Sequence, residues 1–313
     1  LQQYGLEARE MHPVQKGYRN ESYAAALTDG RMVNLIIYKR EPEILSRIRC
    51  ANYVSNFLAS AGMPARATAD PRILEGKAGE FVKYAALYTY LPGTTIPWEA
   101  YTMDHIKQLG AAMSDMHAGL KPLPQKNLPF VIDECRALLK RMEKYFAEDG
   151  VHDALAGKLG LAILDTTGLR PALAASVELP AQALHMDFVR GNILFDDEPK
   201  VTGILDFEKA AWGPPVFDIA RTLAFLLVDC KYKTENKVRK YFLQSGYNKR
   251  GKASFEPTPL LEDLLDFFLL HDFYKFLRHN PYETLEANEH FVRTRDCLLN
   301  RNIIARTEML EYA

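Results

Sequence analysis

The chain has 313 residues, with 39 Lys and Arg against 40 Asp and Glu and a hydrophobic share of 48%. This length predicts one large domain or two lobes with a sizeable core. The near balance of charge gives no electrostatic footprint for nucleic acid or for an anionic membrane. No apolar run approaches the ~20 residues that a membrane-spanning helix needs.

The four cysteines stand singly and form no C-x-x-C pair. This spacing argues against a zinc ribbon and against a disulfide framework. It predicts buried free thiols in a reducing compartment, and therefore a cytoplasmic protein. The chain begins at Leu1 rather than at Met, which leaves open that a leader preceded it.

The first part of the chain has a pattern typical of a β-sheet. Residues 10–40 hold two stretches rich in Tyr, Val, Ile and Leu, separated by the turn sequence TDGR. Residues 79–91 supply a further strand candidate. Between them, residues 42–62 space their apolar side chains at helical intervals, and Gly62 suits the C-terminal cap of that helix.

Residues 91–99, LPGTTIPWE, break this pattern and form the predicted lobe boundary. Amphipathic helical patterns follow, with Asp104 as a possible N-cap of the first, at 104–120, 131–148 and 259–280. The sequence therefore predicts an α+β fold. We expect a small β-rich lobe at 1–92 and a larger, mainly helical lobe at 93–313.

Residues 183–212 interrupt the helical half with two short apolar strands, NILF and VTGILDF, joined by the polar turn DDEPK. Two such strands form a hairpin with its polar residues at the open end. The hairpin would bring Asn192 and Asp206 together, with Asp187 in the loop just before. Two carboxylates and an amide form an all-oxygen site, which suits a Mg²⁺ ion completed by water and phosphate.

The same stretch resembles the catalytic and metal loops of the aminoglycoside phosphotransferase and choline kinase group, the small-molecule relatives of the protein kinases. That group reads H-x-D-x-x-x-x-N, then I-x-D-[FW]-E, then G-x-P-x-x-D-[LI]-A. This chain supplies HMDFVRGN, ILDFE and GPPVFDIA in the same order. The resemblance implies a two-lobed protein-kinase-like fold. It also implies transfer of phosphate from ATP to a hydroxyl group of a small molecule.

The resemblance carries residue roles to this chain. Asp187 would orient the acceptor hydroxyl, and His185 would belong to the catalytic loop as its brace. Asn192 and Asp206 would hold Mg²⁺, with ATP between the lobes. Asp218 would be structural and would tie the loop region together.

Weaker similarities lie upstream. KGYRNESYAAAL resembles the turn that covers the nucleotide phosphates, with Gly17, Asn20 and Tyr23 at its marked positions. YTYLPG resembles the hinge segment whose backbone holds the adenine, which makes Thr89 and Leu91 candidate nucleotide ligands. The resemblance thus implies a nucleotide site in the first lobe.

One position departs from the pattern. The group keeps a Lys in its third strand, as V-L-K-I-Y, to pair with phosphates, whereas this chain has Ile36 there. Lys39 lies three residues on and is a candidate phosphate ligand, although strand alternation points it to the opposite face from Ile36. The sequence therefore leaves open which residue binds the phosphates. The homoserine kinase branch likewise has no Lys at this strand and reads V-L-T-L-Y followed by acidic and basic residues, which YKREPEIL resembles. This resemblance favours amino-acid or amino-alcohol acceptors.

Two other functions are left open at this point. The missing strand lysine favours a degenerate kinase homologue that binds a nucleotide or metabolite without transferring phosphate. A metal-dependent hydrolase built on His185, Asp187 and Asp206 would need further converging ligands.

Several polar residues stand among apolar ones in the helical half. His117 is predicted to be a core histidine with satisfied hydrogen bonds rather than a metal ligand. The polar positions in the last long helix pattern either pack in the core or line an acceptor pocket; they are His271, Asp272 and Tyr274.

Overall fold

The computed structural model describes residues 1–12, 15–16, 20–78, 81–97, 100–164, 166 and 168–307. The chain divides into two compact units, residues 1–95 with 190–210, and residues 96–189 with 211–313. The segment 190–210 thus belongs to the first unit although it comes late in the chain. The lobe boundary at residue 92 stays a prediction. Within the described ranges, no helix combines the length and apolar character that crossing a membrane requires.

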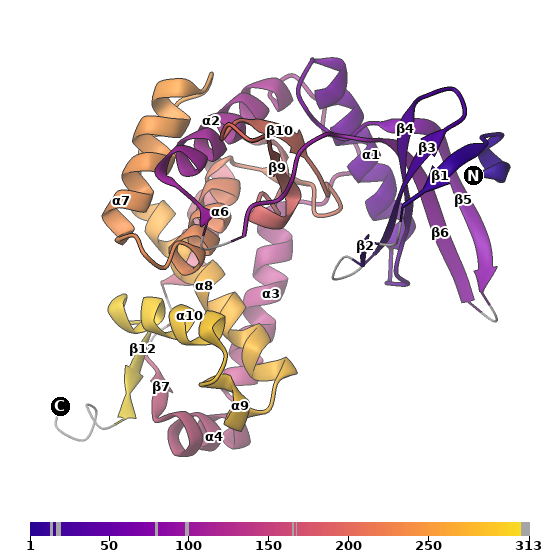
Figure 1. Cartoon of the computed structure of the whole chain (residues 1–313). Coiled ribbons are helices and arrows are strands. Elements are labelled where there is room, and N and C mark those ends of the chain that lie inside the picture. Colours follow the sequence, from indigo (N-terminus) through magenta and orange to yellow (C-terminus); the bar gives the residue numbers. More distant parts are fainter. Residues whose placement is uncertain are drawn as a thin grey trace. The chain divides into compact units, whose positions relative to one another are not determined.

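The first unit contains a six-stranded antiparallel sheet in the order β1-β3-β4-β6-β5, with β2 paired to β3 (Figure 1). The strands are β1 (Ala8–Met11), β2 (Gln15–Lys16), β3 (Glu21–Leu27), β4 (Met32–Ile37), β5 (Thr68–Ala78) and β6 (Phe81–Thr89). The predicted hairpin around TDGR is confirmed, because β3 and β4 pair on either side of it. The strand predicted at 79–91 is confirmed as β6.

The sequence pattern did not predict β5, because Asp70 and Pro71 are typical turn residues. The pairing of β5 with β6 shifts register between Thr68 and Ile73. Asp70 and Pro71 lie within this irregular stretch of the strand. Proline is tolerated there because β5 lies at the edge of the sheet, where a missing N–H costs no ladder hydrogen bond.

Helix α1 (Ile44–Ser60) packs on one face of this sheet (Figure 1). Strand alternation turns Ile36 and Tyr38 toward that helix, where they meet Ile44 and Ile48 in one buried cluster. Burying an isoleucine side chain stabilises the fold by about 1.5–3 kcal/mol, so these contacts fix α1 on the sheet. A second cluster fills the opposite face; it consists of Tyr4, Ala25, Leu27, Val33 and Leu87.

The second unit is mainly helical. Its helices are α2 (Met103–Leu120), α3 (Val131–Phe146), α4 (Asp149–Leu159), α5 (Leu169–Ala175), α6 (Val216–Asp229), α7 (Glu235–Arg239), the π-helix η5 (Lys240–Asn248), α8 (Pro259–His279), α9 (Tyr282–Leu285) and α10 (Glu289–Asn300). Short strands form two small ladders, β8 (Gln182–Leu184) with β11 (Ala211–Gly213) and β7 (Leu161–Ile163) with β12 (Ile304–Arg306). The three predicted amphipathic helices are confirmed as α2, α3 and α8.

The N-cap prediction for α2 was wrong. Thr102 and not Asp104 caps this helix, since the Thr102 side chain accepts the backbone N–H of His105 at 3.3 Å. Gly110 in the same helix lets η5 approach closely, because a Cβ there would lie 2.2 Å from the carbonyl oxygen of Phe242.

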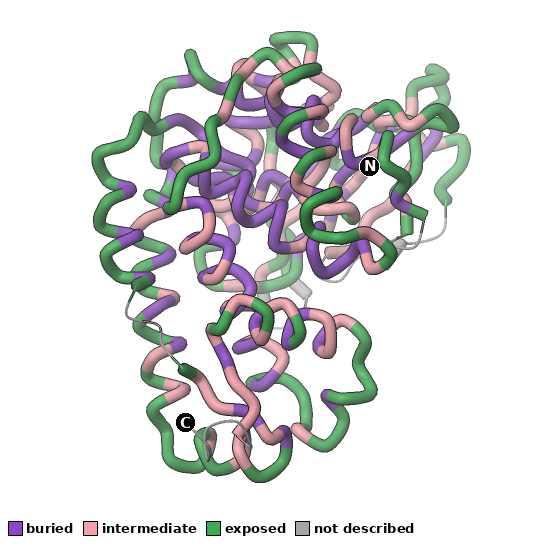
Figure 2. Tube along the Cα trace, turned by 90° about the vertical axis from the view of Figure 1, so that its left-hand side faces the viewer, coloured by how far each residue is buried: buried purple, intermediate pink, exposed green. Residues whose placement is uncertain are grey.

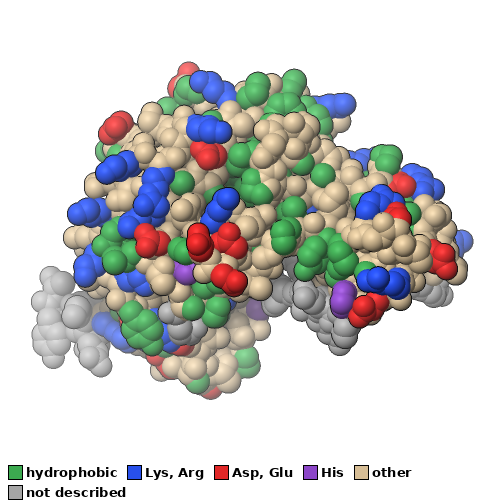
Figure 3. Space-filling model, turned by 45° about the horizontal axis from the view of Figure 1, so that its top comes forward, with side chains coloured by type: hydrophobic (Ala, Val, Ile, Leu, Met, Phe, Trp, Pro, Cys, Tyr) green, Lys and Arg blue, Asp and Glu red, His purple; other side chains and the backbone are tan. Residues whose placement is uncertain are grey.

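Burial and surface charge follow the sequence pattern. Nearly every residue of α6 is buried, and Figure 2 marks the buried positions along the trace. Basic and acidic side chains are interspersed on the face seen in Figure 3, as the balanced composition predicts. Cys50, Cys135 and Cys230 are buried free thiols, whereas Cys297 is free and half-buried.

Candidate active site

The first unit contains the predicted hairpin. Strand β9 (Ile193–Phe195) pairs antiparallel with β10 (Val201–Ile204), and Ile193 lies opposite Ile204. The backbone N–H of Leu205 donates to the carbonyl oxygen of Asn192 at 2.8 Å. Asn192 therefore precedes β9 and Asp206 follows β10 at the same open end, as the sequence predicts.

The donor chemistry at this end fits Mg²⁺. Asn192 offers an amide oxygen and Asp206 a carboxylate, and Mg²⁺ takes few protein oxygens while keeping water and phosphate as its other ligands. Asp206 has φ 55°, a left-handed conformation that Asp tolerates better than most residues and that clusters at functional sites. Among the described residues, no group of three or more His, Cys, Asp or Glu side chains is arranged to hold a metal. The metal role of Asn192 and Asp206 stays a prediction.

Asn20 joins two segments of the first unit. Its Nδ2 donates to Glu208 Oε1 at 2.7 Å, and its Oδ1 accepts the backbone N–H of Lys39 at 3.1 Å. The amide thus connects the end of β4 to the segment that carries Asp206. Sequence reasoning gave Glu208 no role, although it is the last letter of the ILDFE motif.

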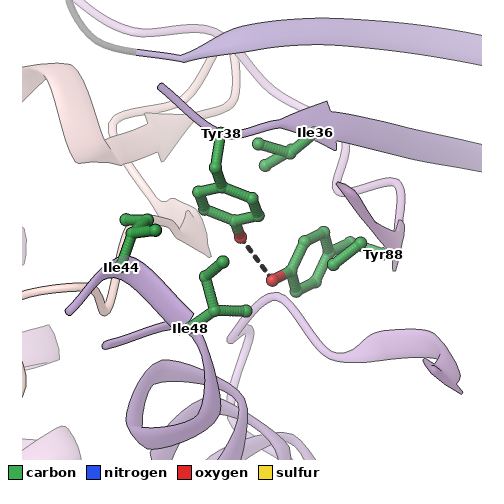
Figure 4. Close-up of a cluster of buried hydrophobic side chains, with 6 residues drawn as sticks. Ile36, Tyr38, Ile44, Ile48 and Tyr88 are labelled. Atoms are coloured by element: carbon green, nitrogen blue, oxygen red, sulfur yellow. Dashed lines mark hydrogen bonds between the residues drawn. The ribbon is translucent and has the colours of Figure 1, made fainter. Parts of the chain in front are cut away.

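The strand position that would hold a lysine is part of the apolar core. Ile36 is buried in the cluster with α1, and Lys39 is exposed. The nearby buried polar groups are hydroxyls: the oxygens of Tyr38 and Tyr88 lie 2.5 Å apart (Figure 4). Tyr88 also donates to Asn52 Oδ1 at 2.8 Å, so a chain of hydrogen bonds connects the sheet to α1.

The predicted hinge segment is fastened to the hairpin. Thr94 and Phe195 exchange two backbone hydrogen bonds of 2.9 Å, and Thr202 Oγ1 donates to the carbonyl oxygen of Pro92 at 2.8 Å. Gly93 has φ 116°, and a Cβ there would lie 2.3 Å from Thr202 Oγ1. Only glycine fits this close approach, which explains the last residue of YTYLPG.

The predicted nucleotide ligands have distinct surroundings. Thr89 is exposed at the end of β6, and its backbone N–H donates to the carbonyl oxygen of Ala67 at 2.9 Å. Leu91 is half-buried and lies two residues beyond the end of this strand. Tyr23 lies in β3 and donates to Glu21 Oε2 at 2.8 Å. Gly17 lies outside the described residues, so the predicted phosphate turn is described only from Asn20 onward.

The second unit holds the predicted catalytic loop, directly after β8. His185 is fully buried, and its Nδ1 accepts the backbone N–H of Asp187 at 3.1 Å. Met186, between them, has φ 60°, an uncommon conformation for a non-glycine residue. Asp218 accepts the backbone N–H groups of His185 at 2.8 Å and of Met186 at 2.6 Å. The prediction that Asp218 ties this loop together is confirmed.

Asp218 is completely buried and charged partners compensate for its burial. Burial alone raises the pKa of its carboxyl, but the hydrogen bond from His117 and the charges of His117 and His185 hold the pKa below its usual value. His117 Nε2 lies 3.1 Å from Asp218 Oδ2, and His117 Nδ1 lies 2.7 Å from the Tyr247 hydroxyl. Both ring nitrogens of His117 are satisfied in the core, as predicted.

Arg221 is the ionic partner of Asp187. Its NH2 lies 3.6 Å from Asp187 Oδ1, and both side chains are largely buried, at 8% and 13% exposure. The guanidinium also lies over the rings of Phe225 and Phe268, at 5.1 and 5.4 Å from their centres. Sequence reasoning missed Arg221, because nothing in the letters DIAR links it to a residue 34 positions earlier.

The three polar positions of α8 do not act together. Asp272 is buried and pairs with Lys275 at 2.5 Å; burial raises the pKa of its carboxyl, but Lys275 and Arg221 bring it below the usual value. Tyr274 instead accepts a hydrogen bond from Arg278 at 2.8 Å. His271 is half-buried. The charge of Arg221 thus acts on Asp272, whereas the hydrogen-bond partner of Tyr274 is Arg278.

The candidate residues fall in both units. Asn192 and Asp206 come together in the first unit with Asn20 linked to Glu208, whereas His185 and Asp187 lie together in the second. Each group is fixed by backbone hydrogen bonds within its own unit. The geometry within each group is compatible with the roles that the sequence assigns.

A protein-family model described as "Phosphotransferase enzyme family" matches residues 10–232. A homoserine kinase of Methylobacterium radiotolerans is 24% identical over 219 residues, which cover 66% of this chain and 61% of that protein. A hydroxylysine kinase of Danio rerio is 23% identical over 246 residues, covering 72% of this chain and 67% of that protein. The chain thus spans about three fifths of the length of the first of these relatives.

Solved structures share the fold. An amicoumacin kinase in complex with AMP-PNP and Ca²⁺ has a TM-score of 0.66 and 16% identity, over 95% of this chain and 90% of that chain. A microcompartment-associated aminopropanol kinase has a TM-score of 0.66 and 13% identity, over 93% of both chains. The predicted α+β, two-lobed protein-kinase-like fold is confirmed.

Proposed function

Because this chain belongs to the phosphotransferase enzyme family, we propose that it transfers a phosphoryl group from ATP to a hydroxyl group of a small molecule, with Mg²⁺ as the metal. The observation that carries the proposal is the fixed loop at residues 185–187, whose conformation Asp218 holds with two backbone hydrogen bonds. Phosphoryl transfer depends on positioning and on charge stabilisation, and a rigid loop with one carboxylate serves the first need.

In this proposal Asp187 accepts a hydrogen bond from the acceptor hydroxyl and aims its oxygen at the phosphorus atom. His185 acts on the loop and not on the substrate, because its Nδ1 accepts the Asp187 N–H. Arg221 restrains the Asp187 carboxylate from the other side. As the new oxygen–phosphorus bond forms, the bond between the γ-phosphorus and the bridging oxygen breaks and ADP leaves with that oxygen; the hydroxyl proton passes to Asp187 late in this exchange.

Asn192 and Asp206 would hold the metal ion in the first unit. An ion held there would supply neutralisation of the phosphate charge during the transfer. Asn20, held by Glu208 and the backbone of Lys39, would contact the phosphates, while the segment around Thr89 and Leu91 would receive the adenine.

The acceptor that we propose is an amino acid or amino alcohol. The support is the homoserine and hydroxylysine kinases among the similar proteins. A cytoplasmic location is also proposed, supported by four free cysteines.

The test is ADP release with ATP or GTP, with and without Mg²⁺, across a panel of hydroxyl compounds. The panel contains homoserine, hydroxylysine, aminopropanol, an aminoglycoside and a sugar. We expect Mg²⁺-dependent turnover with an amino acid or amino alcohol and with ATP preferred. Turnover only with the aminoglycoside or the sugar would overturn the acceptor class and leave the phosphotransferase activity standing.

The buried Ile36 favours one alternative, a kinase homologue that binds nucleotide without transferring phosphate. Titration calorimetry with MgATP distinguishes it from the enzyme. Tight MgATP binding without ADP release across the whole panel would support the alternative against our proposal.

A further inference from the structure

The phosphates of a bound nucleotide need positive charge beyond the metal ion. An ATP–Mg²⁺ complex remains anionic, and phosphoryl-transfer sites place a lysine or arginine against these oxygens. The segment that follows β10 carries two carboxylates, Asp206 and Glu208, against one cation, Lys209, so its net charge is negative. The strand position that could supply a cation holds the buried Ile36. A cation from another part of the first unit must serve if the nucleotide binds there.

We infer that the guanidinium of Arg66 is this cation and binds the phosphates of the nucleotide. This inference rests on the proposed function, since it concerns the same nucleotide. Arg66 lies in the segment between α1 and β5, far in sequence from the motifs of the hairpin. Nothing in the sequence pattern marked it as a site residue.

The backbone places Arg66 beside the metal segment. Ala65 forms a parallel bridge with Ile204, and the N–H of Arg66 donates to the Ile204 carbonyl oxygen at 3.1 Å. Ile204 is the last residue of β10, and Asp206 follows two positions later. The segment that carries Arg66 therefore runs alongside the strand that presents Asp206.

The side chain of Arg66 lies over an aromatic ring of the sheet, that of Tyr88. The guanidinium carbon of Arg66 lies 4.6 Å from the centre of the Tyr88 ring, over its face. The Tyr88 ring is held at its hydroxyl end, because this hydroxyl bonds to that of Tyr38 (Figure 4). The same hydroxyl donates to Asn52 Oδ1. A fixed aromatic ring under a guanidinium orients the cation and leaves its edge N–H groups for an anionic partner.

Charges around Tyr88 give a second, independent indication. Burial raises the pKa of the Tyr88 hydroxyl most, the charge of Arg66 lowers it, and the charges of Glu208 and Asp206 raise it. The pKa of Tyr38, raised well above its usual value by burial, is also lowered by Arg66 and raised by Glu208. The charges of Arg66 and Glu208 thus act on both hydroxyls, and that of Asp206 acts on the hydroxyl of Tyr88.

Lys39 is the rival cation. It follows Tyr38 directly, and Tyr38 turns toward α1, so alternation directs Lys39 to the other side. The Lys39 side chain is exposed, and the backbone N–H of Lys39 donates to Asn20 Oδ1. Lys39 helps to hold Asn20 through its backbone, a contact that survives replacement of its side chain.

The experiment measures binding of MgADP and of adenosine separately, by titration calorimetry, to the wild-type chain and to four variants. Arg66→Met removes the charge, Arg66→Lys keeps it, and Lys39→Met tests the rival. Arg72→Met is the matched control, because Arg72 also lies over a tyrosine ring, that of Tyr4, at 5.3 Å. Adenosine serves as the phosphate-free probe of the same site.

We expect Arg66→Met to weaken MgADP binding by about 10-fold or more while adenosine binding is unchanged. Arg66→Lys should retain most of the affinity, Lys39→Met should lose less than Arg66→Met, and Arg72→Met should match the wild type. Equal MgADP binding by Arg66→Met and wild type would overturn the inference alone. A loss of MgADP affinity in Lys39→Met alone would also overturn the inference. Loss of adenosine binding in both Arg66 variants would overturn it too, because the effect would then not depend on the phosphates. A wild-type chain that binds no MgADP would overturn the proposed function as well.

Discussion

The carboxylate of Asp218 accepts the backbone N–H of Met186 at 2.6 Å, in the middle of the candidate catalytic loop. Met186 has φ 60°, a conformation that costs about 1–3 kcal/mol for a residue of this kind. The structure offsets this cost because the backbone N–H groups of His185 and Met186 donate to the fully buried carboxylate of Asp218. The orientation of the Asp187 side chain therefore depends on Asp218.

Asp218→Asn should destabilise the protein by about 3 kcal/mol, because it removes a buried charge that His117 and two backbone N–H groups compensate. Urea unfolding followed by circular dichroism measures the change. Asp153→Asn is the control, since its side chain is 85% exposed, and its stability should match the wild type. Equal stability of Asp218→Asn and wild type would contradict the anchoring role.

Arg221→Met should lower kcat by about 10- to 100-fold with little change in the KM for ATP. The reason is that Asp187 loses the restraint of its ionic partner, and small misplacements of a reacting group are costly. Steady-state kinetics with the best acceptor measures both constants. Arg221→Lys should recover part of kcat. A rise in the KM for ATP at unchanged kcat would show that Arg221 acts elsewhere.

Gly93→Ala should destabilise the protein by at least about 1–3 kcal/mol. An added Cβ meets Thr202 Oγ1 at 2.3 Å and the Phe195 carbonyl oxygen at 2.8 Å, and φ is 116°. Gly157→Ala is the matched change in open space within α4, where alanine should stabilise by about 1 kcal/mol. Chemical denaturation of both variants tests this, and a neutral Gly93→Ala would contradict the close approach of hinge and hairpin.

The fold should lose stability in alkali above pH ~10. The pKa values of Tyr38 and Tyr88 are raised in the folded state, mainly by burial, and that of Tyr4 is raised to about 12. A raised folded-state pKa means that the stabilisation is complete below the unfolded value of about 10 and is lost as the pH rises through the folded value. Each such tyrosine contributes a slope of about 1.4 kcal/mol per pH unit in that window.

Tyr38→Phe should therefore reduce the alkaline slope of the unfolding free energy, measured between pH 8 and 11. Tyr232→Phe is the control, because Tyr232 is 75% exposed. Identical slopes for Tyr38→Phe and wild type would contradict the burial of the tyrosine pair.

Local patterns predicted much of the fold. The hairpin that presents Asn192 and Asp206 follows from two apolar strands around a polar turn, and α3 and α8 follow from helical spacing of apolar residues. The edge strand β5 did not follow, because Asp70 and Pro71 are turn residues that only the pairing with β6 overrides.

The candidate site was predictable only where its residues share a motif. Asp187, Asn192 and Asp206 stand in recognisable motifs, whereas Arg66 and Arg221 gain their roles from partners far away in sequence. Glu208 stands in the ILDFE motif, but its bond to Asn20 joins positions that no motif connects. No periodicity carries information on such contacts. The N-cap of α2 shows the same limit at short range, since the sequence predicted Asp104 as the cap and the helix instead begins two residues earlier, after Thr102.

The most direct test of the account is the rate of Mg²⁺-dependent ADP release by Asp187→Asn, with the acceptor that the wild type uses best. We predict a rate at least about 100-fold below that of the wild type, because the amide cannot take the hydroxyl proton. The variant also leaves Arg221 without its ionic partner, so its thermal midpoint should fall and the rates are compared at a temperature at which both proteins are folded. A rate within about 10-fold of the wild type would contradict the assignment of Asp187, and with it the proposed mechanism.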